Sequence, residues 1–168
     1  DPDTCLESLE DNLRFMEAHA QHPLNFGRVE LYAGTPLLAR MLEERRAVGD
    51  WMQWDYPLHD AQIERVFQMA MRAFHERNFS GTALANELMG TRFEVELVRH
   101  FHPHRYQRSW LDEAKRLSRR LGVDSVTGLR QLIARVRSTA ETGADNQFAD
   151  ELGQRLRAVE LEVRACAR

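Results

Sequence analysis

Cysteine is scarce in this sequence, which has only two, Cys5 and Cys166, in a chain of 168 residues. They lie at opposite ends, so nothing indicates the disulfide framework of a small secreted domain. One long-range disulfide between them stays formally open. The low cysteine content favours a reducing compartment, and we expect a cytoplasmic location.

Long apolar runs and a large excess of one charge are also missing. No segment approaches the roughly 18 apolar residues that cross a bilayer, and no secretory signal pattern opens the chain. The net charge of −3 gives no general reason to expect nucleic acid or an anionic membrane as a partner. The hydrophobic share of 43% and the charged share of 29% are ordinary for a globular protein with one real core.

Strand patterns are almost absent, and only residues 24–32 read convincingly as a strand. Alternation in FGRVELY would place Arg28, Glu30 and Tyr32 on one side and Val29 and Leu31 on the other. The charged side has two readings. It is either the solvated face of an edge strand, or it lines the inside of a structure of which this chain forms only one wall.

The rest of the sequence has helical periodicity and separate capping signals. Thr4 and Glu7 form a capping-box pattern, Thr35 with Pro36 indicates a helix start, and Asp60 is a good N-cap. Gly90 predicts a kink or a break within a helix, and Gly122 predicts a helix end. The predicted helices span 5–19, 36–47, 60–76, 82–101, 109–122, 125–136 and about 147–165. A chain that begins at a helix cap also looks cut from something longer.

Several residue clusters suggest chemistry, but each has a simpler reading. His100, His102 and His104 would suit a metal, yet Pro103 interrupts the helix that carries them, so we expect no metal site. HERNF at 75–79 lacks the second histidine of a zinc helix and reads as a helix end. Cys5 follows a helix cap, but no histidine or second cysteine lies near it in the sequence.

Aromatic and basic residues also have two readings. The aromatic linker contains Trp51, Trp54 and Tyr56. These rings would either stack on a planar ligand or, in the simpler reading, pack across a core. Arginines alternate with apolar residues on the later helices, which is typical of a solvated face rather than a binding patch. These arginines are Arg116, Arg119, Arg120, Arg130, Arg135 and Arg137.

Three motifs together resemble one enzyme family. DPDT before a helix, RVELYAGTPL, and a GDW…WDYP segment are similar to the later part of a radical SAM enzyme, most closely of the cobalamin-dependent branch. Pro2-Asp3-Thr4 matches the turn after the fifth barrel strand of that family. Tyr32, Gly34, Thr35 and Pro36 match the turn after the sixth. The resemblance covers residues 1–58, about a third of the chain.

The resemblance implies a mainly α fold with one α/β unit. Residues 1–58 would be the last part of a partial (β/α) barrel, and residues 59–168 a C-terminal helical bundle. Arg28, Glu30 and Tyr32 would face the barrel lumen, where S-adenosylmethionine and a small-molecule or peptide substrate lie. Cobalamin and a 4Fe-4S cluster would belong to the intact enzyme, with no nucleic acid or membrane as partner.

The sequence departs from the family in one large respect. It contains no C-x-x-x-C-x-x-C motif, so this chain cannot hold the iron–sulfur cluster. The cobalamin-binding half and the first barrel strands are absent as well. The chain would then be a C-terminal fragment that is inactive without the remainder of the enzyme, and its residues identify no catalytic group. The alternative is a stand-alone helical domain that binds a protein or peptide without catalysis.

Overall fold

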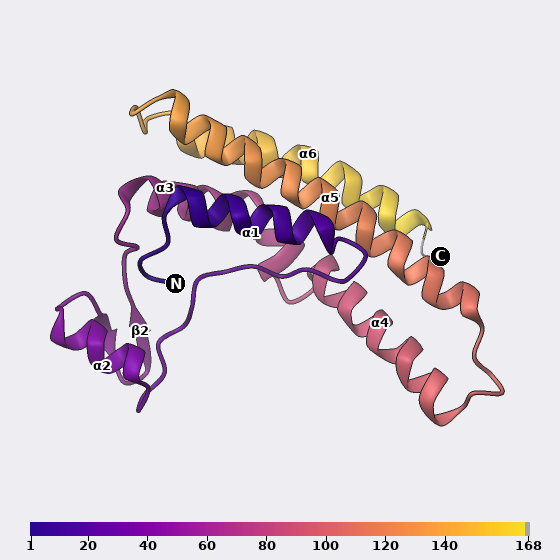
Figure 1. Ribbon diagram of the computed structural model, residues 1–168. Helices are drawn as coiled ribbons and strands as arrows, with labels where there is room; N and C mark the ends of the chain where they lie inside the picture. Colours follow the sequence, from indigo (N-terminus) through magenta and orange to yellow (C-terminus); the bar gives the residue numbers. More distant parts are fainter. Residues whose placement is uncertain (167–168) are drawn as a thin grey trace.

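The computed structural model describes residues 1–166 and is mainly α (Figure 1). A two-stranded antiparallel hairpin pairs β1 (Val48–Asp50) with β2 (Gln53–Asp55). A short π-helix, His75–Phe79, follows α3. The α-helices are α1 (Leu6–Ala18), α2 (Pro36–Glu43), α3 (Ala61–Ala73), α4 (Leu84–Phe101), α5 (Arg108–Ser138) and α6 (Asp145–Cys166).

The helices form a layered body with two projections. α5 and α6 run side by side as a long antiparallel pair, and α1 and α3 lie against this pair (Figure 1). α4 packs on the first half of α5 and extends away from the body. α2 and the hairpin form a small group at the other end, joined to the body by irregular chain.

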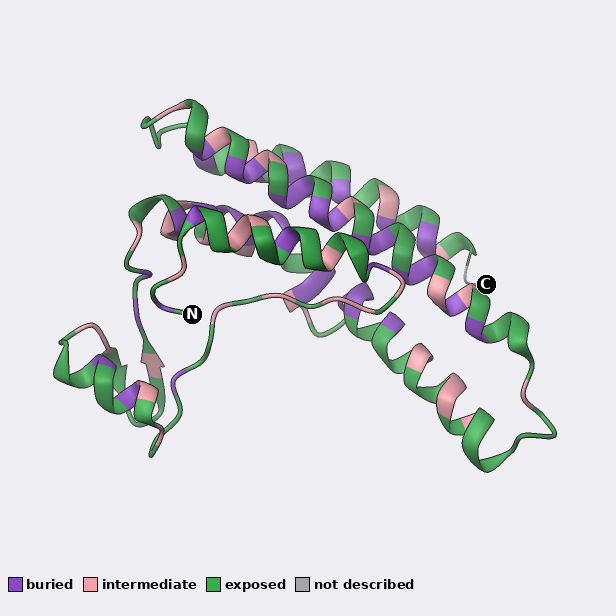
Figure 2. Ribbon diagram, viewed as in Figure 1, coloured by how far each residue is buried: buried purple, intermediate pink, exposed green. Residues whose placement is uncertain are grey.

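One hydrophobic cluster joins the early and late parts of the chain. Leu31, Met41 and Tyr56 belong to the same buried cluster as Leu132 on α5 and Leu152 on α6. Figure 2 shows the buried residues concentrated where the long helices meet, with exposed residues over α2, the hairpin and much of α4. A smaller cluster lies between α4, α5 and α6, and the burial of both clusters supplies the main stabilisation of the fold.

The strand predicted at 24–32 is not formed. The segment 23–32 has no regular secondary structure. Within residues 1–166, no main-chain N–H or C=O group from 23 to 31 is hydrogen-bonded to another main-chain group. An extended segment becomes a strand only when a second segment pairs with it. In the described part of the chain no segment does so, which is why the alternating pattern gave the wrong prediction.

The hairpin was not expected, because its strands are three residues each. α2 ends at Glu43 rather than near residue 47, and Arg45 follows with a φ of 55°. Gly49 lies in β1 with a φ of 102°, and its backbone passes so close to Gln53 that a side chain would collide.

A break at Gly90 and the helix end predicted at Gly122 do not occur. α4 continues through Gly90, and α5 continues through Gly122 and Ser125 as one helix. A Cβ atom at Gly122 would lie 3.2 Å from the Cβ atom of Ala20 and 3.3 Å from Leu24 Cδ1. The glycine therefore lets the segment after α1 pack closely on α5, a role that helical periodicity alone does not reveal.

The predicted helix starts were mostly correct. Thr35 caps α2 and Asp60 caps α3, each accepting hydrogen bonds from the main chain of the first turn. At α1 the box forms one residue later than expected. The Cys5 N–H donates to Ser8 Oγ at 3.1 Å, whereas the Thr4 hydroxyl donates to the Asp1 carbonyl oxygen.

Candidate functional site

A groove of about 580 Å³ lies between the irregular segment, the hairpin and the end of α3. All three residues expected to bind a cofactor, Arg28, Glu30 and Tyr32, line it. The structure thus brings the predicted set together, although no strand carries it. The other lining residues are Gly27, Leu31, Ala33, Trp51, Met52, Gln53, Trp54, Asp55, Phe67, Met71 and Phe79.

Arg28 clamps the segment to the hairpin. Its guanidinium pairs with the Asp55 carboxylate and donates to the Tyr56 carbonyl oxygen. Its Cζ atom lies 4.7 Å from the ring centre of Tyr56 and 4.9 Å from that of Phe67, so the cation is held between two aromatic rings. In this chain Arg28 therefore has a full set of partners from the protein itself.

Tyr56 completes this clamp from the other side. Its ring is buried, with 2% exposure, and its hydroxyl donates to the Val29 carbonyl oxygen at 2.6 Å. Burial raises the pKa of Tyr56 above its ordinary value. The aromatic linker of the sequence is thus used for packing at Tyr56, which joins the hairpin to residues 28 and 29.

Glu30 and Tyr32 behave differently, because both are exposed and turn to the groove. The Tyr32 hydroxyl donates to Glu30 Oε2, and this hydrogen bond together with the negative charge raises the pKa of Tyr32. Tyr32 is 61% exposed, and Glu30 forms no ion pair within residues 1–166. These two side chains are available for a ligand in a way that Arg28 is not.

The groove has an aromatic rim and a small negative charge. Trp51, which is 80% exposed, and Met52 lie at the hairpin tip, and Trp54 lies deeper. The charged lining groups are Arg28, Asp55 and Glu30, and the first two neutralise each other. The uncompensated charge is the carboxylate of Glu30.

A second cavity, of about 310 Å³, lies on the α1 side of the same segment. Its lining is mostly apolar and comes from α1, α3 and residues 26–28. Phe26 packs edge-on against Phe74 at a centroid distance of 5.1 Å and so fixes the segment between the two hollows. Gly27 and Arg28 of the irregular segment therefore line both cavities.

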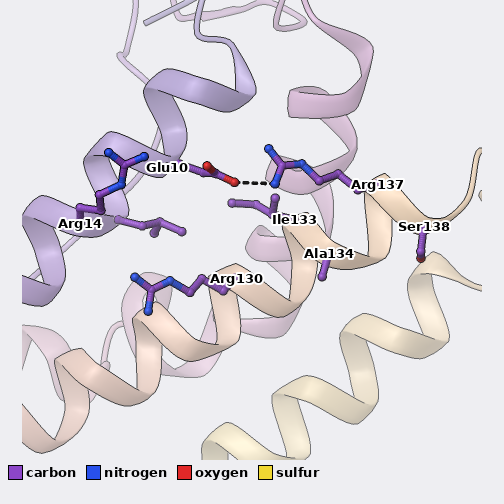
Figure 3. A pocket seen from close by; sticks show the side chains of 8 residues that line it. Glu10, Arg14, Arg130, Ile133, Ala134, Arg137 and Ser138 are labelled. Atoms are coloured by element: carbon purple, nitrogen blue, oxygen red, sulfur yellow. Dashed lines mark ion pairs between the residues drawn. The ribbon is translucent and has the colours of Figure 1, made fainter.

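A third depression lies between α1 and α5 and is shown in Figure 3. Arg14, Arg130 and Arg137 surround an apolar floor that includes Ile133. Each arginine already has a carboxylate partner: Asp11, Glu17 and Glu10, respectively. Arg130 and Arg137 are about half exposed, in agreement with the solvated face predicted for these arginines. Because each arginine of the depression is paired, the depression offers no uncompensated charge.

The most buried charge is one that sequence reasoning missed. Arg77, on the π-helix, is 1% exposed. It donates to Glu160 Oε1 at 3.0 Å, Ser125 Oγ at 3.1 Å and the Leu156 carbonyl oxygen at 2.6 Å. Asp124 lies 2.8 Å from it. Glu160 follows Leu156 by four residues and so falls on the apolar face of α6. This position of a carboxylate was the sequence feature that could have indicated the buried pair.

The remaining candidates do not assemble. Within residues 1–166 no group of histidine, cysteine, aspartate or glutamate side chains has the arrangement of a metal site. The rings of His102 and His104 are 6.2 Å apart, and both residues are exposed. Cys5 and Cys166 are free and exposed. Two cysteines do not provide the thiolates that an iron–sulfur cluster needs, so the residues present do not fit that group.

Comparison with known proteins gives no relative. No protein-family model, curated protein or solved structure matches the chain. Among the helices described, none combines the length and the apolar composition needed to cross a membrane.

Proposed function

We propose that this chain is the C-terminal part of a radical SAM enzyme, of the cobalamin-dependent branch, and forms one barrel wall and a helical cap over the substrate cavity. The observation that carries the proposal is that, within residues 1–166, the main chain of residues 23–31 forms no hydrogen bond with another main-chain group, while two cavities adjoin residues 26–33. Backbone groups of an extended segment are normally satisfied by neighbouring strands. A barrel strand that lies between two others has main-chain N–H and C=O groups on both edges that the neighbouring strands must pair.

The apolar cavity beside α1 supports the same view. In a barrel, helices cover the outer face of the strands and bury apolar side chains there. Leu13 and Met16 on α1 and Val66 on α3 line this cavity next to Phe26. An additional strand with apolar side chains would fill it and pair with the open edge of residues 23–31.

The three site residues then have two different roles. Arg28 holds the hairpin against the wall, because its charge is already matched by Asp55. Glu30 and Tyr32 offer hydrogen-bonding groups to S-adenosylmethionine or to a small-molecule or peptide substrate. The cysteines that bind the 4Fe-4S cluster, and the cobalamin site, belong to the remainder of the enzyme, which is the main partner of this chain in the cytoplasm.

The direct test is the reading frame that encodes the residues before Asp1. We expect it to encode a C-x-x-x-C-x-x-C motif and a cobalamin-binding region in the same polypeptide. In that full-length enzyme, Glu30→Gln should lower the rate of S-adenosylmethionine cleavage without changing the melting temperature. The matched surface change Glu94→Gln should leave both the cleavage rate and the melting temperature unchanged. A frame without the three-cysteine motif would contradict the assignment.

A stand-alone interaction domain is the second candidate, and α4 gives the observation that favours it. Met89, Phe93, Leu97 and Phe101 recur every fourth residue on this helix and are all exposed. An apolar stripe of this kind suits a helix or peptide partner. If residues 1–168 alone are monomeric and melt cooperatively, and Glu30→Gln changes no activity of the full-length protein, this second function is favoured.

A further inference from the structure

We infer that α4 docks an amphipathic helix of another protein, whose apolar face lies along α4 and whose acidic end lies beside the loop that joins α4 to α5. The groove beside Glu30 and the family assignment play no part in this docking face, which lies at the other end of the molecule from α2 and the hairpin (Figure 1). The apolar stripe of α4 thereby receives a partner of stated chemistry.

α4 has apolar residues on two opposite faces. On the inner face, Leu84, Ala85 and Leu88 belong to the smaller buried cluster with residues of α5 and α6. After Leu88 no residue of α4 is buried, and the apolar residues of the outer face are 38% to 65% exposed. A helix that is apolar on all sides is normally covered on all sides, so we expect the outer face to be covered by a partner. The stripe on this face consists of Met89, Phe93, Leu97 and Phe101.

The position of α4 leaves this stripe accessible. The helix packs on the first half of α5 and extends away from the body (Figure 1). Figure 2 shows half-buried and exposed residues over its far half. At a rise of about 1.5 Å per residue, the stripe from Met89 to Phe101 is about 18 Å long. This length accommodates three turns of a partner helix that carries apolar residues at the same spacing.

The loop at the end of the stripe is basic and exposed. Residues 99–108, the basic tip, contain three arginines and three histidines but no aspartate or glutamate. Two of the arginines reach carboxylates only at the surface, with 3.4 Å from Arg99 to Glu96 and 3.8 Å from Arg108 to Asp112. Arg105 forms no ion pair within residues 1–166. The uncompensated charge beside the stripe is therefore positive, and it complements an acidic end of the partner.

The carboxylates along the stripe favour a protein helix over a lipid surface or a nucleic acid. Glu94 lies three residues before Leu97, and Glu96 lies three residues after Phe93, so both are neighbours of the stripe on the helix surface. Glu96 pairs with two arginines, whereas Glu94 forms no ion pair in the described part of the chain. An anionic membrane or a phosphate backbone laid along α4 would be repelled by these groups. A protein helix carries its carboxylates at chosen positions and avoids this repulsion.

Fluorescence anisotropy of a labelled synthetic peptide tests the docking directly. The probe is a helix of about five turns with leucine at every third or fourth residue and glutamates in its first turn. Its matched control has lysines in place of these glutamates. We expect saturable binding of the glutamate peptide, about tenfold tighter than that of the lysine peptide, because several exposed ion pairs of modest strength act together. This preference should shrink as the salt concentration rises.

Two pairs of variants separate the apolar stripe from the basic tip. Phe93→Gln should weaken the binding of both peptides at least about tenfold, whereas Leu161→Gln, at a similarly exposed residue of α6, should change neither. Arg105→Glu should abolish the preference for the glutamate peptide, whereas Arg14→Glu, on the exposed surface of α1, should preserve it. Circular dichroism checks that each variant is folded, and Phe101→Gln replaces Phe93→Gln if that variant is unfolded.

Other occupants of the stripe give different results. Sedimentation of the unliganded protein should show a monomer, and a dimer that Phe93→Gln dissociates would assign the stripe to a second copy. Vesicles containing phosphatidylserine should not bind, and binding that Phe93→Gln removes would assign the stripe to a membrane. Either of these results, equal affinity for the two peptides, or no saturable binding by folded protein would overturn the inference.

The same titration on the polypeptide extended by the residues encoded upstream separates this inference from the family assignment. We expect equal peptide affinity with and without the extension, because α4 lies at the other end from α2 and the hairpin. If only the extended polypeptide fails to bind, the remainder of the enzyme covers α4, and the inference is overturned while the assignment stands. A reading frame without the three-cysteine motif contradicts the assignment and leaves the docking face unaffected.

Discussion

The helical body, residues 59–166, and the irregular region, residues 23–58 with α2 and the hairpin, differ in how their main-chain groups are hydrogen-bonded. The body encloses Arg77 with two carboxylates and buries long rows of leucine and valine. The irregular region leaves Val29, Val48 and Trp51 exposed, and within residues 1–166 its main chain over 23–31 forms no hydrogen bond with another main-chain group.

Exposed apolar residues do not separate the two regions, because Met89, Phe93 and Phe101 on α4 are exposed as well. The body also contains buried side-chain atoms without a hydrogen-bond partner, such as Ser118 Oγ. The difference between the two regions therefore lies in the main chain of residues 23–31.

The largest effect should come from Arg77, because its removal leaves Glu160 buried without a partner. Arg77→Met should lower the free energy of unfolding by about 3–5 kcal/mol, measured by urea denaturation. Arg72→Met is the matched control, since Arg72 and its partner Asp150 are each about half exposed. The control should cost less than about 1 kcal/mol. Similar losses in the two variants would show that burial does not distinguish them.

A smaller effect is expected at Arg28, which joins residues 23–32 to the hairpin. Arg28→Met should cost about 1–2 kcal/mol, because a partly buried ion pair and two ring contacts are lost. Amide hydrogen exchange should also become faster in β1 and β2, with α5 and α6 unchanged. Arg14→Met is the control, since its pair with Asp11 is fully on the surface. Unchanged exchange in the hairpin would contradict the role of Arg28 as a clamp.

The smallest effect concerns pH at Asp3. The hydrogen bond from Arg46 holds the pKa of Asp3 below its ordinary value, and Arg40 adds to this. Since the folded-state pKa is the lower one, the stabilisation is present above the unfolded pKa of about 3.9 and is lost as the pH falls through the folded value. Carbon-13 NMR titration of the carboxylate should show this lowered midpoint, and Arg46→Gln should raise it. A midpoint unaffected by Arg46→Gln would mean that the surrounding water screens the pair.

Helix positions were predictable from the sequence where one physical signal dominated. The caps Thr35 and Asp60 set the starts of α2 and α3 because a side-chain oxygen satisfies the first-turn amides locally. Gly122 was wrongly predicted to end a helix, because the glycine serves tertiary packing there. Ala20 and Leu24 approach it closely. The alternation at 24–32 misled because pairing depends on a neighbour that periodicity does not report.

The sequence grouped Arg28, Glu30 and Tyr32 correctly in space, but it did not predict their different contacts. Arg28, Glu30 and Tyr32 share one side of an alternating pattern, and they do line one groove. The pattern did not separate Arg28, which Asp55 neutralises, from Glu30, which stays available. Asp55 comes from a hairpin too short to give a strand signal, so its pairing with Arg28 could not be foreseen. Arg77 was missed because a single arginine in HERNF is indistinguishable from a surface residue until its surroundings fold.

Amide hydrogen exchange over residues 24–31 tests most directly whether this segment is a barrel strand without its neighbours. It should be measured in the chain of residues 1–168 and in the polypeptide extended by the residues encoded upstream. The account predicts fast exchange of these amides in the short chain and strong protection in the extended one, while α5 and α6 are equally protected in both. Equal exchange of the segment in the two polypeptides would contradict it.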